Sequence, residues 1–327
     1  MYKTTWRPRD GRITVKLKSQ SAAVQNYWDK LLRGYPHDNP AADTAEITLE
    51  LEVTEQLPPL PTAEPIFVDQ RFETADFGNV SVYDGEQPQQ LKLSFSKGAV
   101  VDLTLTRPLQ ACGLVNQLMV HSSRFEDTLF TTLAPLLRRY GLYFVHAFGA
   151  TIAGEGVLIV GPSGSGKTTA GLRLMLDGWS LLANDGVMFT QRPEGVIALP
   201  TPGFVSVRLP TLELLPDLAA HVGQIFDTAE DKVFLTAKQV AKDNWSAAVP
   251  IRRIYFPRIV DQVHSTLRPM NGAIGLAYLM EESVDRWDTE TLMAHLGCLQ
   301  ALVKQADVYE LQLGRDLSTL PALLRPC

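Results

Sequence analysis

The sequence predicts a mixed α/β protein in two parts: an N-terminal α+β region over residues 1–124 and a second domain with a mixed sheet over residues 125–327. Three observations support this prediction. In several short stretches of the first part apolar residues alternate with polar ones, which is typical of half-buried strands. In the second part short apolar runs alternate with helical patterns. A glycine-rich loop at residues 161–168 joins one of those apolar runs to a helical pattern.

Composition limits the classes of protein that remain possible. The chain has 327 residues, 45% of them hydrophobic and 20% charged, which is enough for one large or two ordinary domains with a buried core. This excludes disorder as the main state. A formal net charge of -6 and a pI of about 5.6 argue against a nucleic-acid partner, which needs clustered Lys and Arg.

Cysteines and hydropathy point to a reducing compartment. Cys112, Cys298 and Cys327 lie far apart with no Cys-x-x-Cys spacing, so we expect neither a zinc site nor a disulfide framework. The N-terminus lacks the apolar region of a signal peptide, and no stretch reaches the roughly 18 apolar residues of a membrane span. A cytoplasmic location without a membrane partner is therefore the expectation.

The first part is expected to contain strands and one helix, and none of its residues points to a chemistry. The expected elements are a strand at 13–17, an amphipathic helix at 24–32, and half-buried strands at 47–53, 91–95 and 101–105. We expect the last three strands to be antiparallel. The proline-rich stretch at residues 57–65 predicts a long connection.

The second part is expected to begin with a helix at residues 125–140. A strand at 142–147, a glycine turn, a strand at 157–160, the loop and a helix at 169–176 follow. After a strand at 179–185, the expected strands are 195–200, 204–208, 232–235, 251–259 and 308–313, and the expected helices are 273–280 and 292–303.

The loop itself matches a complete phosphate-binding P-loop (Walker A) pattern, Gly-Pro-Ser-Gly-Ser-Gly-Lys-Thr. Glycines let the backbone turn its N–H groups toward a polyphosphate, and the start of the following helix adds partial positive charge. Lys167 would place its ammonium on the β- and γ-phosphates, and Thr168 would give its hydroxyl to Mg²⁺. The expected nucleotide-binding residues are Gly161, Ser163, Gly164, Ser165, Gly166, Lys167, Thr168 and Thr169. A plain glycine turn is the alternative, but it leaves Lys167 unexplained.

A carboxylate follows the next apolar strand. A magnesium site beside a P-loop requires an acid at the carboxyl end of a neighbouring strand, and Asp185 is in that place. An Asn-Asp-Gly turn between the strands of a hairpin is the alternative interpretation of the same residues, and both can hold together.

The order of a Val-His-Ala strand at His146, the P-loop at 161–168 and the strand end Leu181–Asp185 resembles the kinase domain of the HPr kinase/phosphorylase family. The similarity is specific over about residues 142–187 and weaker outside them. It implies a phosphoenolpyruvate-carboxykinase-like fold, ATP with Mg²⁺, and phosphate transfer to a serine hydroxyl of a partner protein or peptide. Homo-oligomers also occur among such kinases.

By position, the resemblance implies catalytic roles for Lys167, Asp185 and His146, with Thr168 and Asp185 holding the metal. A core histidine is the alternative for His146. The chain departs from the family pattern at Asn184, where the family usually has a first acid that serves as a candidate base. An amide cannot accept that proton. The family's second signature, a segment with Glu and Arg, is not recognisable around residues 201–208.

Three functions remain open from the sequence. The leading one is an ATP-dependent kinase, a transferase acting on serine in a partner. The second is a nucleotide-binding regulatory or assembly module without phosphotransfer, which Asn184 motivates. The third is phosphorylation of a small hydroxylated metabolite.

Overall fold

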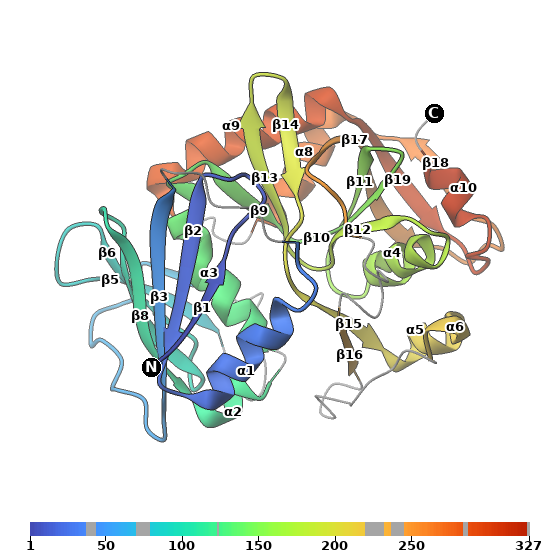
Figure 1. The fold of residues 1–327 in the computed structure, drawn as a ribbon. Coiled ribbons are helices and arrows are strands. Elements are labelled where there is room, and N and C mark those ends of the chain that lie inside the picture. The colour runs from blue at the N-terminus through green and yellow to red at the C-terminus, as the bar shows by residue number, and fades with distance from the viewer. Residues whose placement is uncertain are drawn as a thin grey trace. The chain divides into compact units, whose positions relative to one another are not determined.

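The computed structural model describes residues 1–36, 44–69, 79–122, 124–219, 232–236, 245–283 and 287–325 (Figure 1). The chain divides into two compact units, one of residues 1–32 and 37–140 and the other of residues 33–36 and 141–327. The helix expected to open the second domain, α3 (Arg124–Arg138), is counted with the first unit because it packs on two strands of that unit's sheet, β7 (Ala99–Thr104) and β8 (Leu109–Asn116). The structural division therefore follows Tyr140 and not residue 124.

Eight strands in the described part of the first unit form one mixed sheet, in the order β1-β2-β3-β8-β7-β6-β5-β4. They are β1 (Tyr2–Trp6), β2 (Ile13–Ser19), β3 (Ala45–Thr54), β4 (Phe67–Asp69), β5 (Val80–Asp84), β6 (Gln90–Ser94), β7 (Ala99–Thr104) and β8 (Leu109–Asn116). The helices are α1 (Ala22–Leu31), α2 (Gln117–Val120) and α3. Ile47, Leu49 and Leu51 of β3 are fully buried while the residues next to them are half-buried or exposed, as in a sheet with one covered face.

The expected direction of one strand is wrong. Residues 91–95 and 101–105 do belong to an antiparallel pair, β6 and β7, but β3 runs parallel to both β2 and β8. Helix α1 lies between β2 and β3 in the chain, and such a crossover returns the chain to the same end of the sheet. Residues 55–66 form neither helix nor strand, as the prolines predict.

The described part of the second unit contains a nine-stranded mixed sheet and a separate two-stranded ladder, β15-β16. The strands of the sheet are β9 (Leu142–Val145), β10 (Ala147–Ile152), β11 (Glu155–Val160), β12 (Ser180–Ala183), β13 (Val187–Arg192), β14 (Gly195–Leu199), β17 (Val249–Ile259), β18 (Thr266–Pro269) and β19 (Asp307–Leu313). The ladder pairs β15 (Phe204–Arg208) with β16 (Lys232–Thr236). The helices are α4 (Lys167–Leu176), α5 (Leu209–Leu214), α6 (Pro216–Ala219), α8 (Gly272–Glu281), α9 (Thr289–Gln305) and α10 (Leu320–Leu324).

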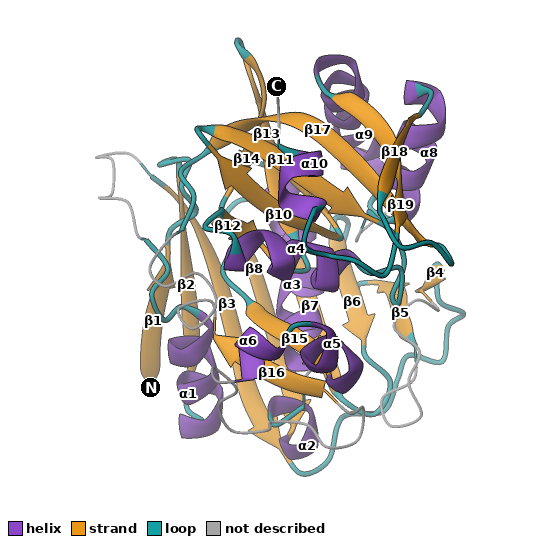
Figure 2. Ribbon diagram, turned by 90° about the vertical axis from the view of Figure 1, so that its right-hand side faces the viewer, coloured by secondary structure: helices purple, strands orange, loops and turns teal. Residues whose placement is uncertain are grey.

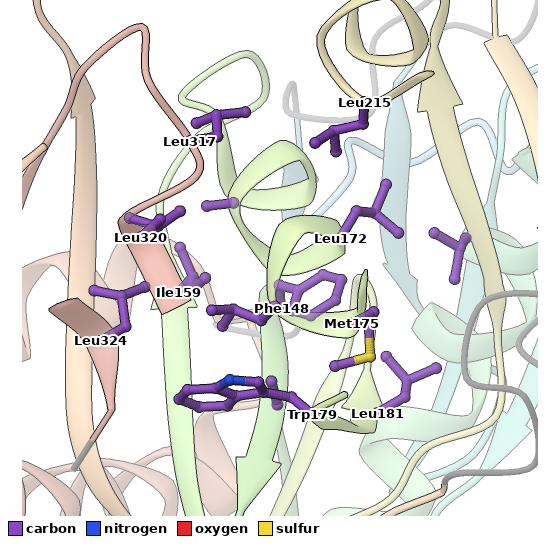
Figure 3. Packing of buried hydrophobic residues seen from close by; sticks show 14 of the residues in the cluster. Phe148, Ile159, Leu172, Met175, Trp179, Leu181, Leu215, Leu317, Leu320 and Leu324 are labelled. Carbon is purple, nitrogen blue, oxygen red and sulfur yellow. The ribbon is translucent and has the colours of Figure 1, made fainter. Parts of the chain in front are cut away.

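Both faces of this sheet are covered, which explains why the last four residues of β11, Val157 to Val160, are all apolar. Val157 and Ile159 point into a cluster with α4 and α10, and Leu158 and Val160 point into another with α8 and α9. Figure 2 shows these helices around the sheet, and Figure 3 shows the first cluster, with Phe148, Trp179 and Leu320 among its members. A strand buried on both faces has no polar side, so its sequence is a continuous apolar run.

Two local expectations of the sequence differ from the structure. The expected strand at 142–147 is interrupted at His146, where the chain leaves β9, which pairs with β13, and enters β10, which pairs with β11. Residues 184–186 do not close a hairpin, because β12 pairs with β10 while β13 pairs with β9 and β14.

Among the described residues, no helix is both long and apolar enough to cross a membrane.

Helix α4 approaches β10 closely at a glycine, and this contact is testable. A Cβ on Gly171 would overlap the ring of Phe148, so we expect Gly171→Ala to lower the free energy of unfolding by about 1–3 kcal/mol. Gly297→Ala in α9 is the matched control. A Cβ there meets nothing within 4 Å, so it should be neutral or stabilise by up to about 1 kcal/mol. Urea unfolding measures both, and equal effects would contradict the close packing of α4.

Candidate functional site

Strand directions bring the predicted site residues to one edge of the second unit's sheet. β11, β17 and β19 are parallel, and β12 has the same direction because both β11 and β12 are antiparallel to β10. The carboxyl ends of these four strands therefore share one edge with the beginning of β10. The glycine loop at residues 161–168 follows β11, Asp185 follows β12, and His146 precedes β10. This edge is where open α/β sheets bind their ligands.

The glycine loop has the backbone that a P-loop needs. Gly164 and Gly166 have φ values of 82° and 97°, a region that favours glycine. A Cβ at Gly166 would come within 2.6 Å of Leu313 Cδ2, so the loop also packs closely on the end of β19. The first helical hydrogen bond runs from the Ala170 N–H to the Gly166 carbonyl oxygen at 2.9 Å. The N–H groups of residues 166–169 precede that bond and have no partner within the helix, as at any helix start.

Lys167 is a buried cation at the start of α4. Its side chain is 6% exposed, and Nζ donates to the carbonyl oxygens of Gly161 and Pro162, the latter at 3.1 Å. Burial lowers the pKa of Lys167, and the charges of Asp185 and Glu282 oppose that shift. Within the described part of the chain no carboxylate lies within ion-pair distance of Nζ. An anion in the loop would supply the counter-charge that this ammonium lacks.

Asn184 and Asp185 form a hydrogen-bonded pair at the end of β12. Asn184 Nδ2 donates to Asp185 Oδ2 at 2.7 Å and to the carbonyl oxygen of Phe204 at 3.1 Å. Both contacts require the amide nitrogen, so they determine the orientation of the amide group. Asn184 is 5% exposed, and its Oδ1 has no hydrogen-bond partner among the described residues. The amide therefore holds the Asp185 carboxylate in place while one acceptor stays unused.

His146 connects two acidic segments through hydrogen bonds to their backbones. Its N–H donates to the carbonyl oxygen of Glu282 at 2.7 Å, and its Nδ1 lies 2.8 Å from the carbonyl oxygen of Asp185. Because a carbonyl only accepts, Nδ1 carries the proton and Nε2 is left for another contact. The structure thus places His146 beside Asp185, and its resolved contacts are those of a positioning residue.

Two residues at this site were not found from the sequence. Glu282 follows α8 and is half-buried, and its charge acts on Lys167. Arg208, the last residue of β15, donates from Nη2 to Ser163 Oγ in the P-loop at 3.4 Å. Glu282 belongs to no motif, and only the tertiary structure places it here. For Arg208, the sequence did contain a possible signal, because an arginine stands at the end of an expected strand.

Three further residues predicted to bind nucleotide, Thr169, Ser165 and Thr168, differ in whether another protein group contacts them. The Thr169 hydroxyl lies 3.0 Å from the Thr211 hydroxyl of α5, so another protein group already contacts it. Ser165 Oγ is shielded and has no hydrogen-bond partner in the described chain. Thr168, the second residue of α4, is half-buried.

The residues present could hold Mg²⁺ only together with phosphate oxygens and waters. No three His, Cys, Asp or Glu side chains of the described residues gather closely enough to hold a metal ion by themselves. Mg²⁺ commonly binds one or two protein oxygens together with phosphate oxygens and waters. Asp185 Oδ1, which accepts no hydrogen bond among the described residues, and the Thr168 hydroxyl are the two protein ligands available for such a site.

Several proteins that are similar to this chain are HPr kinase/phosphorylases. The HPr kinase/phosphorylases of Cupriavidus metallidurans and Cupriavidus necator are 30% and 26% identical to it over 206 residues, which is 62% of this chain and 59% of each relative. The HPr kinase/phosphorylase of a Geobacillus species is 37% identical over 84 residues, 26% of this chain and 25% of that protein. No family model matches the chain. The chain thus spans less than two thirds of the length of these relatives.

Among solved structures, the HPr(Ser) kinase/phosphatase of Coxiella burnetii is 14% identical and covers 55% of this chain and 90% of its own. The TM-score is 0.27, too low to support an argument about the fold. The relationship therefore rests on the sequence matches. Over 62% of its length, this chain is a distant homologue of the HPr kinase/phosphorylases.

Proposed function

We propose that this protein binds ATP with Mg²⁺ at the P-loop of an HPr-kinase-like, phosphoenolpyruvate-carboxykinase-like domain and transfers the γ-phosphate to a serine hydroxyl of a partner protein or peptide. The observation that supports this most directly is the Lys167 ammonium, buried in the glycine loop with only carbonyl oxygens as hydrogen-bond acceptors. The homology to HPr kinase/phosphorylases supports the reaction class.

Each residue of the site has a task in this proposal. The N–H groups at the start of α4 and in the loop would bind phosphate oxygens, with the helix dipole adding to the attraction. Lys167 would contact the transferring phosphate, and Thr168 and Asp185 would hold Mg²⁺. When bound there, Mg²⁺ would supply positive charge to neutralise the charge that develops on the phosphate oxygens. His146 keeps Asp185 in position through its backbone contact.

Asn184 favours a second candidate, a nucleotide-binding regulatory or assembly module without transfer. The residue that the related kinases use as a candidate base is here an amide, and an amide does not accept a proton. Phosphorylation of a small hydroxylated metabolite is a further form of the leading proposal, differing only in its acceptor.

Removal of the Lys167 ammonium tests nucleotide binding. We expect Lys167→Ala to weaken binding of a non-hydrolysable ATP analogue by about 10- to 100-fold, because one charged contact to phosphate is lost, and to abolish transfer. Calorimetry with Mg²⁺ measures the affinity. Lys304→Ala, at an exposed position near the end of α9, is the matched control and should bind normally. A wild-type protein that gives no binding heat with ATP or GTP would refute the proposed function.

The affinity for nucleotide should depend on the protonation of Lys167. Burial lowers the pKa of Lys167 from 10.5, and only the protonated form attracts phosphate. Affinity should therefore fall as the pH rises into the alkaline range, and this fall should begin at a lower pH than for an ordinary lysine. Since bound phosphate raises this pKa again, binding in that range should take up protons. Calorimetry in buffers of different ionisation enthalpy measures the uptake, and a flat affinity without proton uptake would contradict the lowered pKa.

Replacement of the amide by an acid separates the two candidate functions. Both groups that receive hydrogen bonds from Asn184 Nδ2 are acceptors, so Asn184→Asp would face a carboxylate and a carbonyl without a donor. We expect it to lower the free energy of unfolding by about 1–3 kcal/mol and to leave transfer no faster. Asn271→Asp is the matched control, because Asn271 uses its Oδ1 to accept from the Ala273 N–H, and a carboxylate does the same.

Thermal unfolding and transfer of labelled phosphate provide the two measurements. A strong gain of transfer in Asn184→Asp would show that the natural chain lacks its base and would favour the module without transfer.

A further inference from the structure

We propose that Glu282 accepts the proton of the attacking hydroxyl, and so supplies from the end of α8 the carboxylate that is missing at Asn184. This inference rests on the proposed function, since it names the base of that reaction. It is carried by the hydrogen bonds of His146, which fix the Glu282 backbone, by the charge of Glu282 acting on Lys167, and by the contacts of the other candidate bases.

The backbone of Glu282 is fixed from both sides. Its N–H donates to the Tyr278 carbonyl oxygen at 3.1 Å, which ends α8 in a regular turn. Its carbonyl oxygen accepts from the His146 N–H at 2.7 Å. The first contact ties Glu282 to α8 and the second ties it to the bend between β9 and β10. The half-buried Glu282 therefore begins from a defined point at the edge of the sheet where the P-loop lies.

The same histidine holds the other acid of the site. His146 donates through its backbone to Glu282 and through Nδ1 to the Asp185 backbone, so one residue fixes two acidic segments that are far apart in the chain. The charges of both acids act on the buried Lys167. Two acids on separate elements therefore act electrostatically on the ammonium that would contact the transferring phosphate.

The other candidate bases are already engaged. Asn184 is an amide and accepts no proton. The Asp185 carboxylate receives the Asn184 Nδ2–H at 2.7 Å and is the acid at the strand end where Mg²⁺ would bind; a bound cation weakens a carboxylate as a base. His146 carries its proton on Nδ1 and acts on the positions of both acids. Glu282 receives no hydrogen bond to its carboxylate from the described residues, so its carboxylate can serve as the base.

The step balances without any further reactant. As the acceptor oxygen forms its bond to the γ-phosphorus of ATP, its O–H bond breaks and the proton goes to the Glu282 carboxylate. The bond between the γ-phosphorus and the bridging oxygen to the β-phosphate breaks, and its electron pair leaves with ADP. Lys167 stays protonated throughout and stabilises the charge of the transferring group.

The test compares Glu282→Gln with Glu281→Gln, the same change at the exposed neighbouring residue. Turnover of Mg²⁺·ATP is measured with water and with serine-containing peptides as acceptors, over a range of pH, and ATP affinity is measured by calorimetry. We expect Glu282→Gln to lower turnover by about 10²- to 10⁴-fold and to remove the acidic limb of the pH–rate profile. Its ATP affinity should be unchanged or higher, because a negative charge near the phosphates is gone. Glu281→Gln should behave like the wild type.

Each other outcome overturns this inference in a recognisable way. If Glu282→Gln turns over ATP like Glu281→Gln, or keeps the acidic limb, the base is another group, and the proposed function stands. If the wild type binds ATP but transfers phosphate to neither acceptor, no proton is accepted and Glu282 is not a base. If the wild type does not bind ATP, the proposed function itself fails. An unchanged ATP affinity in Glu282→Gln also shows that the variant is folded.

Discussion

The burial of one ammonium group is the constraint on which the site depends. Moving a cation out of water costs several kcal/mol, while a hydrogen bond to a charged group returns about 1.5–3 kcal/mol. The carbonyl oxygens of Gly161 and Pro162 thus offset a large part of the cost for Lys167, and the more distant charges of Asp185 and Glu282 offset more. Neither acid forms an ion pair with Nζ among the described contacts, which leaves the lysine able to meet an anion.

The sheet positions the groups that offset the cost of burying the Lys167 ammonium. Lys167, Asp185 and Glu282 come from three elements, and His146 from the bend between two strands. Because β11, β12 and β17 run in the same direction, Lys167 and Asp185 lie at one edge of the sheet. The antiparallel β10 begins at that edge as well. His146 lies at the bend between β9 and β10. Its backbone N–H therefore takes no part in the hydrogen bonds between strands and donates to the Glu282 carbonyl oxygen. A continuous strand at residues 142–147 would lose that contact.

Most helices and strands of the second unit could be predicted because each is a local pattern, and one short segment likewise carries the whole glycine loop between β11 and α4. Strand direction could not be predicted, because the alternation in residues 47–53 is the same for a parallel and an antiparallel strand. The direction of β3 relative to its neighbours was therefore predicted wrongly. Glu282 could not be predicted either. Its neighbours form no motif, and its backbone contact with His146 depends on how α8 returns to the sheet. Arg208 reaches Ser163 through tertiary structure in the same way.

Asn184 stands where the related kinases have an acid. This difference changes the distribution of charge at the site more than the total charge. Two adjacent carboxylates repel each other and compete for one proton, whereas an amide beside Asp185 donates to it and fixes its orientation. With Glu282 counted, the charges of two carboxylates still act on one lysine, but the two acids belong to separate elements that His146 joins. An acid at the end of α8 moves with that helix. A kinase built in this way would couple the position of its base to the packing of α8, which a pair of acids on one strand does not do.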